Sequence, residues 1–180
     1  IHEVLQETRS SIKGITKDFT VIHHAETERT KKSFERNIRM LELQLKDELH
    51  DPDARTYYYL ASTYIDAGEN EKAKDLFDKY SERSGWDQER SVALNKLGKI
   101  YLSEGDKAEA RKYFSWAHAE DPFNPEPRVE LASIEVELEQ WTKAVSWLKE
   151  VEQMDSHQTT LEVNPLTMTF RTYILLAECY

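Results

Sequence analysis

The chain has 180 residues, of which 39% are hydrophobic and 32% are charged, and its formal net charge at pH 7 is −10. Residues 1–50 contain as many acidic as basic residues, so residues 51–180 carry the whole acidic excess. Because contacts with nucleic acid or with anionic membrane surfaces need a basic stripe, we expect neither. No apolar run is long enough to predict a membrane span, and the single cysteine, Cys179, excludes an internal disulfide and indicates a cytoplasmic location.

The first 24 residues have the pattern of two short strands. Residues 1–5 and 19–24 are rich in β-branched side chains that roughly alternate with polar ones, and Gly14 lies between them. Because two strands alone cannot form a stable domain, we expect residues 1–24 to complete a sheet that precedes Ile1. A first residue that is not an initiator methionine agrees with the hypothesis of a longer protein.

Residues 25–52 are predicted to form a linking helix. Apolar side chains recur there at spacings of four and three residues, which place them on one face of a helix. They are Phe34, Ile38, Leu41, Leu45 and Leu49. The helix is expected to end near Pro52, because proline disfavours a helical conformation for the residue before it.

Residues 53–180 repeat one pattern with a period near 34. Leu60 returns 37 residues later as Leu97 and after another 34 as Leu131. A period of this length with these residue types predicts stacked helix-turn-helix units. The recurring residues are Leu60, Ala61, Tyr64, Gly68, Ala73 and Phe77, then Leu97, Gly98, Tyr101, Gly105, Ala110 and Phe114, then Leu131, Ala132, Trp141, Ala144 and Leu148. The small residue after each leucine is expected to let the paired helices approach closely.

Three helix pairs and the first helix of a fourth are expected. The pairs cover residues 54–67 with 70–84, 89–104 with 107–120, and 126–139 with 140–154. Gly68 and Gly105 would close the first helix of their pairs in the left-handed conformation, whereas the third pair has no glycine at that turn. A polar loop is predicted at 155–165, after which Leu176 restarts the pattern.

These repeated residues resemble the tetratricopeptide repeat family, although Glu135 replaces the expected tyrosine in the third unit. The resemblance implies an all-α fold, a right-handed superhelix of helix pairs whose first helices line a concave groove. It also implies that the groove binds a protein or peptide partner. By register, the groove residues would be Arg55, Tyr58, Ser62, Asn95, Lys96, Lys99, Val129 and Ser133.

Some members of that family clamp the C-terminal carboxylate of a peptide with lysine, asparagine and arginine side chains. Only Asn95, Lys96 and Lys99 have suitable chemistry here, because Tyr58 and Val129 stand where such a clamp needs charged or amide groups. A solvated or self-packed groove is the alternative.

A second contact surface is expected at the end of the chain. The last helix would lack the second helix of its pair, so Tyr173, Leu176 and Tyr180 would leave apolar surface uncovered. Because exposed apolar patches favour association, we expect self-association through this helix.

The amino-terminal residues carry another resemblance. The order of Ile1-His2-Glu3-Val4-Leu5, Val21-Ile22-His23-His24 and Arg36-Asn37, followed by tetratricopeptide repeats, is similar to bacterial family-2 glycosyltransferases. The resemblance implies that His2 binds a metal ion or the nucleotide diphosphate, and that Glu3 shapes the acceptor side. The parent protein would then be an inverting transferase that uses a nucleotide-sugar and Mg²⁺ or Mn²⁺. In the alternative, His2 and Glu3 only end a strand.

Neither a catalytic residue nor a cofactor is assigned within the chain itself. Asp51-Pro52-Asp53 has the letters of an Asp-x-Asp metal site, but it lies between two helices and is predicted to be a turn and a helix cap. Two functional hypotheses therefore remain. The chain is a repeat scaffold carried by a glycosyltransferase, or it is a stand-alone adaptor without enzyme activity.

Overall fold

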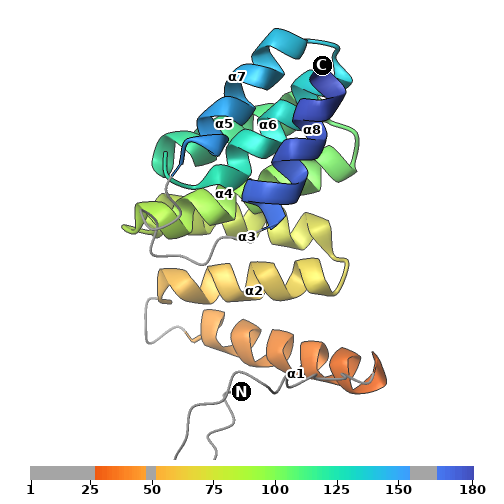
Figure 1. The fold of residues 1–180 in the computed structure, drawn as a ribbon. Coiled ribbons are helices and arrows are strands. Elements are labelled where there is room, and N and C mark those ends of the chain that lie inside the picture. The colour runs from red at the N-terminus through yellow and green to blue at the C-terminus, as the bar shows by residue number, and fades with distance from the viewer. Residues whose placement is uncertain (1–26, 48–51, 155–165) are drawn as a thin grey trace, which may run out of the picture.

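The computed structural model describes residues 27–47, 52–154 and 166–180. These residues form eight α-helices and one π-helical turn, η1, and contain no strand. The all-α class is therefore confirmed for this part of the chain, in which successive helices stack on one another (Figure 1). The strands predicted within residues 1–24 and the loop predicted at 155–165 lie outside the described residues and stay predictions.

The helices follow one another with short connections. They are α1 (Thr27–Leu45), α2 (Ala54–Asp66), α3 (Asn70–Arg83), α4 (Asp87–Ser103), α5 (Lys107–Glu120), α6 (Pro125–Glu137), α7 (Trp141–Glu152), η1 (Thr167–Arg171) and α8 (Thr172–Cys179). The six helices predicted between residues 54 and 154 are all present, and their bounds differ from the prediction by two residues at most. The linking helix is shorter than predicted. It ends at Leu45 rather than near Pro52, and Figure 1 shows α2 running back alongside it in the opposite direction.

Short polar side chains fix the points at which several helices begin. The Asp53 carboxylate accepts a hydrogen bond from the backbone N–H of Arg55 at 3.2 Å, so Asp53 is a helix cap, as predicted. Asp106 and Asn124 cap α5 and α6 in the same way. A cap of this kind contributes about 1 kcal/mol, because it satisfies a backbone N–H that has no partner within the helix.

The three turns inside the helix pairs adopt one backbone conformation. Gly68 has a φ of +80° and Gly105 a φ of +86°, as expected for glycines that close a helix. The third turn, which lacks glycine, places Glu139 in the same left-handed region with a φ of +57°. The geometry of the repeat is thus retained at the third turn although its residue is unfavourable there.

The small residues of the repeat lie where paired helices come closest. Ala61 and Ala132 are fully buried. A Cβ atom built on Gly98 would lie 2.4 Å from Cε1 of the buried Phe114, so α4 and α5 can meet at this distance only because residue 98 is glycine. The register derived from the repeat is therefore confirmed.

The helix α1 covers the first repeat. Its side chains Ile38, Leu41 and Leu45 pack against the largest apolar cluster, which extends from α2 to α5. The hydroxyl of Tyr64 on α2 donates a hydrogen bond to Glu42 Oε1 at 2.6 Å, and burial together with this carboxylate raises the pKa of Tyr64 to about 12. Figure 1 shows α1 alongside α2 at one end of the stack.

The other end of the described stack is α8, which packs against α6 and α7. Tyr173 and Tyr180 are 54% and 84% exposed, as predicted. The prediction was wrong for Leu176, which is buried because it faces Ala132 and Leu148 in the last apolar cluster. Within the described ranges, no helix combines the length and apolar character that a membrane span requires.

Candidate functional site

The residues predicted to line the groove occupy the first helices of three units. Arg55, Tyr58 and Ser62 lie on α2, Asn95, Lys96 and Lys99 on α4, and Val129 and Ser133 on α6. The structure brings the side chains of α2 and α4 together, and links those of α4 to acidic residues of α6. The prediction that Val129 lines the groove was wrong. This residue has no exposed surface, because α6 is packed against α5, α7, α8 and η1, so Val129 belongs to the core.

Lys96 is the residue that joins α2 to α4. Its Nζ donates a hydrogen bond to Ser62 Oγ at 2.8 Å and lies 4.9 Å from the centre of the Tyr58 ring and 5.9 Å from that of Phe77. Burial lowers the pKa of Lys96, and the nearby carboxylate of Asp66 opposes this effect. Among the residues that the structure describes, Lys96 makes no ion pair. This half-buried ammonium group therefore keeps hydrogen-bonding capacity for a further acceptor.

The other two candidates for a carboxylate clamp are already engaged. Glu126 Oε2 accepts hydrogen bonds from Asn95 Nδ2 at 3.0 Å and from Lys99 Nζ at 2.9 Å. Lys99 Nζ also lies 3.5 Å from Glu130 Oε1. A carboxylate of the protein itself thus takes the place that a ligand carboxylate would need, and the self-packed alternative holds for this part of the groove.

The same polar contacts continue to the last helix. Arg171 of η1 donates two hydrogen bonds to the Glu130 carboxylate, at 2.7 and 3.0 Å, which raise the pKa of the guanidinium. Sequence reasoning missed Glu126, Glu130 and Arg171. Glu130 directly precedes Leu131, as Lys96 precedes Leu97, so the repeat register could have placed it in the groove.

Arg55 lies apart from these contacts, toward the start of α2. Its guanidinium is 5.5 Å from the centre of the Trp86 ring, and its Nε is 3.6 Å from Glu89 Oε2. Glu89 also accepts a hydrogen bond from the hydroxyl of Tyr80 at 2.5 Å. Arg55 therefore holds the loop before α4 in place. The last predicted groove residue, Ser133, is half-buried on α6.

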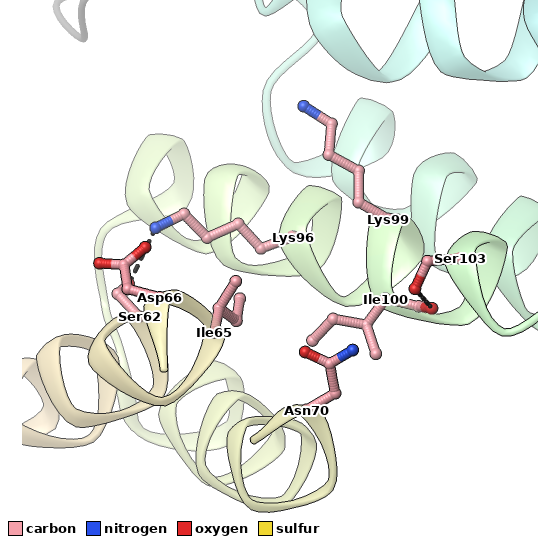
Figure 2. Close-up of a pocket in the computed structure, with 8 residues that line it drawn as sticks. All are labelled: Ser62, Ile65, Asp66, Asn70, Lys96, Lys99, Ile100 and Ser103. Carbon is pink, nitrogen blue, oxygen red and sulfur yellow. Dashed lines mark hydrogen bonds between the residues drawn. The ribbon is translucent and has the colours of Figure 1, made fainter. Parts of the chain in front are cut away.

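Two cavities adjoin one another beside α2. The first has a volume of about 330 Å³ and lies between α2 and α4, with Lys96 and Lys99 on one wall (Figure 2). Its lining is Ser62, Ile65, Asp66, Asn70, Lys96, Lys99, Ile100 and Ser103. The second, of about 470 Å³, lies between α1 and α2. Its lining is Asn37, Met40, Leu41, Gln44, Tyr59, Ser62, Thr63 and Asp66. Ser62 and Asp66 line both cavities.

The part of the chain that the structure describes holds no group of three or more His, Cys, Asp or Glu side chains that could bind a metal ion. His2 and Glu3, for which a metal or nucleotide-sugar role was predicted, lie outside the described residues. The site on α2 and α4 has the chemistry of a binding surface, with hydroxyls, apolar walls and the Lys96 ammonium group, which makes no ion pair with any residue that the structure describes.

Comparisons with known proteins bear on the repeats. The family model described as "Tetratricopeptide repeat" matches residues 58–125 and again residues 95–158. No curated protein matches the chain. One similar structure contains nearly identical TPR-like repeats of a Podosopora anserina protein likened to kinesin light chain. It is 20% identical over 85% of this chain and 78% of its own, with a TM-score of 0.60.

Another similar structure is the C-terminal part of a TPR repeat-containing protein from Cytophaga hutchinsonii. It is 15% identical, and the match covers 85% of this chain and 59% of that chain, with a TM-score of 0.55. At these identities the likeness to both structures shows the fold alone.

Proposed function

Because the chain belongs to the tetratricopeptide repeat family, we propose that its repeats are an interaction scaffold that binds a segment of a protein partner on the face formed by α2 and α4. The observation that carries this proposal is the contrast along the groove. Between α4 and η1 the polar side chains bind one another. Glu126 accepts hydrogen bonds from Asn95 and Lys99, and Glu130 accepts one from Arg171. Between α2 and α4 a cavity remains, and Lys96 in its wall makes no ion pair within the described part of the chain.

The arrangement suits recognition of a peptide. A pocket with apolar walls and a few convergent polar groups gives both affinity and orientation. Ile65 and Ile100 supply the apolar walls, and Lys96 and Ser103 supply polar groups beside them. The half-buried ammonium lies over aromatic rings, which fixes its position before a ligand arrives.

A selection experiment tests this function. A phage-displayed library of random peptides is selected on the full chain, and the enriched peptides are measured by fluorescence polarisation. We expect Ser103→Arg, which places a large cation in the α2–α4 cavity, to weaken their binding about tenfold or more. Ser115→Arg is the matched control. Ser103 and Ser115 are both exposed and each donates to a backbone carbonyl, but Ser115 lies on α5, away from the cavity.

Two results would contradict the proposal. One is a selection that enriches no peptide sequence. The other is a set of peptides whose binding falls equally with Ser103→Arg and Ser115→Arg, because the α2–α4 face would then have no special role.

We further infer, from the resemblance of residues 1–24 and of Arg36-Asn37 followed by repeats, that a glycosyltransferase carries these repeats. The order of a linking helix followed by repeats supports this hypothesis, since α1 precedes the first pair. His2 and Glu3 would then act at the metal or nucleotide-sugar site. The alternative, a stand-alone adaptor, predicts no such activity.

Hydrolysis of nucleotide-sugars by the full-length product, measured with Mg²⁺ or Mn²⁺, separates these hypotheses. We expect His2→Ala to abolish most of the activity, because an imidazole is a common ligand of divalent ions. Unchanged activity in that variant would contradict the role of His2, and no activity in the parent would favour the adaptor.

A further inference from the structure

One wall of the cavity between α1 and α2 comes from outside the part of the chain that matches the repeat family. The family match begins at residue 58, whereas Met40 and Leu41 come from α1. The helix α1 therefore adds a wall to the first repeat that the repeat itself does not supply. Figure 1 shows that this wall stands beside α2, on the side away from α4.

The walls of this cavity are apolar and open. Met40 and Tyr59 are 57% and 52% exposed, and Leu41 is half-buried between them and the core. On the α1 side the polar groups are the uncharged amides of Asn37 and Gln44, and on the α2 side they are the hydroxyls of Ser62 and Thr63 and the carboxylate of Asp66. Exposed methionine and tyrosine side chains on a concave surface favour contact with an apolar side chain of a partner.

The junction between the two cavities carries opposite charges. In Figure 2 the side chains of Ser62, Asp66 and Lys96 gather at one side of the α2–α4 cavity. Among the residues that the structure describes, Asp66 makes no hydrogen bond or ion pair, and Lys96 donates to Ser62 alone. The Asp66 carboxylate also acts on the Lys96 ammonium group through its charge. Because the two charges offset each other, they give a charged ligand no net attraction, while each keeps hydrogen-bonding capacity for a ligand.

A peptide main chain fits this pair of charges. Its carbonyl oxygen accepts from an ammonium group and its N–H donates to a carboxylate, and it brings no net charge. The apolar cavity begins directly beside this junction, because Ser62 and Asp66 line both. A residue whose main chain lies at the junction can thus place its side chain between α1 and α2.

We propose that this face binds an extended, uncharged peptide segment with one large apolar residue, whose side chain occupies the α1–α2 cavity while its main-chain amides bind Lys96 and Asp66. The proposal rests on the peptide-binding function proposed above and names the ligand class and the anchoring cavity.

The test uses the peptides enriched by the selection, labelled with fluorescein, and the full chain. Their sequences are expected to share one large apolar position flanked by uncharged residues. Met40→Asp is expected to weaken binding about tenfold or more, because it places a charge where the apolar side chain is buried. Leu43→Asp is the matched control, since Leu43 lies on the same helix, is 60% exposed and does not line the cavity. It is expected to change the affinity less than about twofold.

Met40→Ser is the second variant, and unchanged thermal unfolding of all three variants shows that they fold. Peptides that bind wild-type chain, respond to Ser103→Arg and are insensitive to both Met40 substitutions would overturn the inference and leave the proposed function standing. A shared acidic or basic position would overturn it as well. A selection without enriched peptides would overturn both. Binding that appears only after removal of residues 1–26 would show that this segment, rather than a partner, occupies the cavity.

Discussion

Replacing Gly98 by alanine is the most direct perturbation of the repeat packing. The added Cβ would lie 2.4, 2.6 and 2.9 Å from Cε1, Cδ1 and Cζ of Phe114. Real Cβ atoms do not approach carbon atoms so closely, and the ring has no exposed surface through which it could move away. The substitution therefore has to push α4 away from α5, or tilt the ring into its neighbours.

Two effects of opposite sign decide the magnitude. Alanine favours the helix over glycine by about 1 kcal/mol. Overpacking a filled core costs about 1–3 kcal/mol, and because the new Cβ meets three ring atoms, we expect a cost at the upper end of this range. We expect the free energy of unfolding to fall by about 1–2 kcal/mol in total. Urea unfolding followed by circular dichroism measures this change.

Two control variants separate the clash from other effects. Gly85→Ala has open space around the new Cβ, and we expect it to leave the chain as stable as the wild type or slightly more stable. Phe114→Leu removes ring atoms, so Gly98→Ala should cost at least about 1 kcal/mol less in that background. An increase in stability for Gly98→Ala alone, or equal costs in both backgrounds, would refute the packing that the structure shows.

Four further substitutions test other features of the fold. Gly105→Ala should cost about 1 kcal/mol because its φ is +86°, and Glu139→Gly should gain up to about 1 kcal/mol at the matching turn, both measured by urea unfolding. Arg111→Ala should cost about 2–4 kcal/mol, because Arg111 Nη2 lies 2.5 Å from the fully buried carboxylate of Glu135; a cost near zero would contradict this pairing. Burial and the Arg128 charge lower the pKa of His118, so the unfolded chain binds this proton more readily and stability should fall as pH drops below about 6.5. His118→Gln should remove part of that loss between pH 7.5 and pH 5.5, and an unchanged pH dependence would contradict it.

The repeat period was sufficient to predict the helix pairs. Glycine and alanine at fixed positions require a close approach of helices, and this requirement placed Gly98 against α5 correctly. Propensity alone could not predict that Glu139 adopts the left-handed conformation. At this turn the packing of α6 against α7 determines the backbone conformation, and the residue type changes only the free energy that this conformation costs.

The candidate site was predicted in part. Ser62, Lys96 and Lys99 do line a cavity, because the register of the repeat fixes which face of the first helix they occupy. Val129 stands two residues before the repeat leucine, whereas Ser62 and Lys99 stand two residues after it. Asn95 occupies the same position as Val129 in the second unit and is buried as well, so this position faces the core in both units.

The ion pairs of the groove were not predictable from spacing. Glu130 and Arg171 are 41 residues apart in the sequence, and their contact depends on how η1 leads into α8. Glu126 engages Asn95 and Lys99 from the following unit. The residues of a clamp can therefore be present in the sequence while the clamp itself is occupied by the protein's own carboxylates.

Nuclear magnetic resonance tests most directly whether α2 and α4 form the binding face. The full chain, labelled with ¹⁵N, is titrated with a peptide enriched by the selection, and the amide shifts are followed. We predict shifts at Ser62, Asp66, Lys96 and Ser103, which line the α2–α4 cavity. Shifts confined to the second helices of the pairs, α3, α5 and α7, or to α8 would contradict a binding face on α2 and α4.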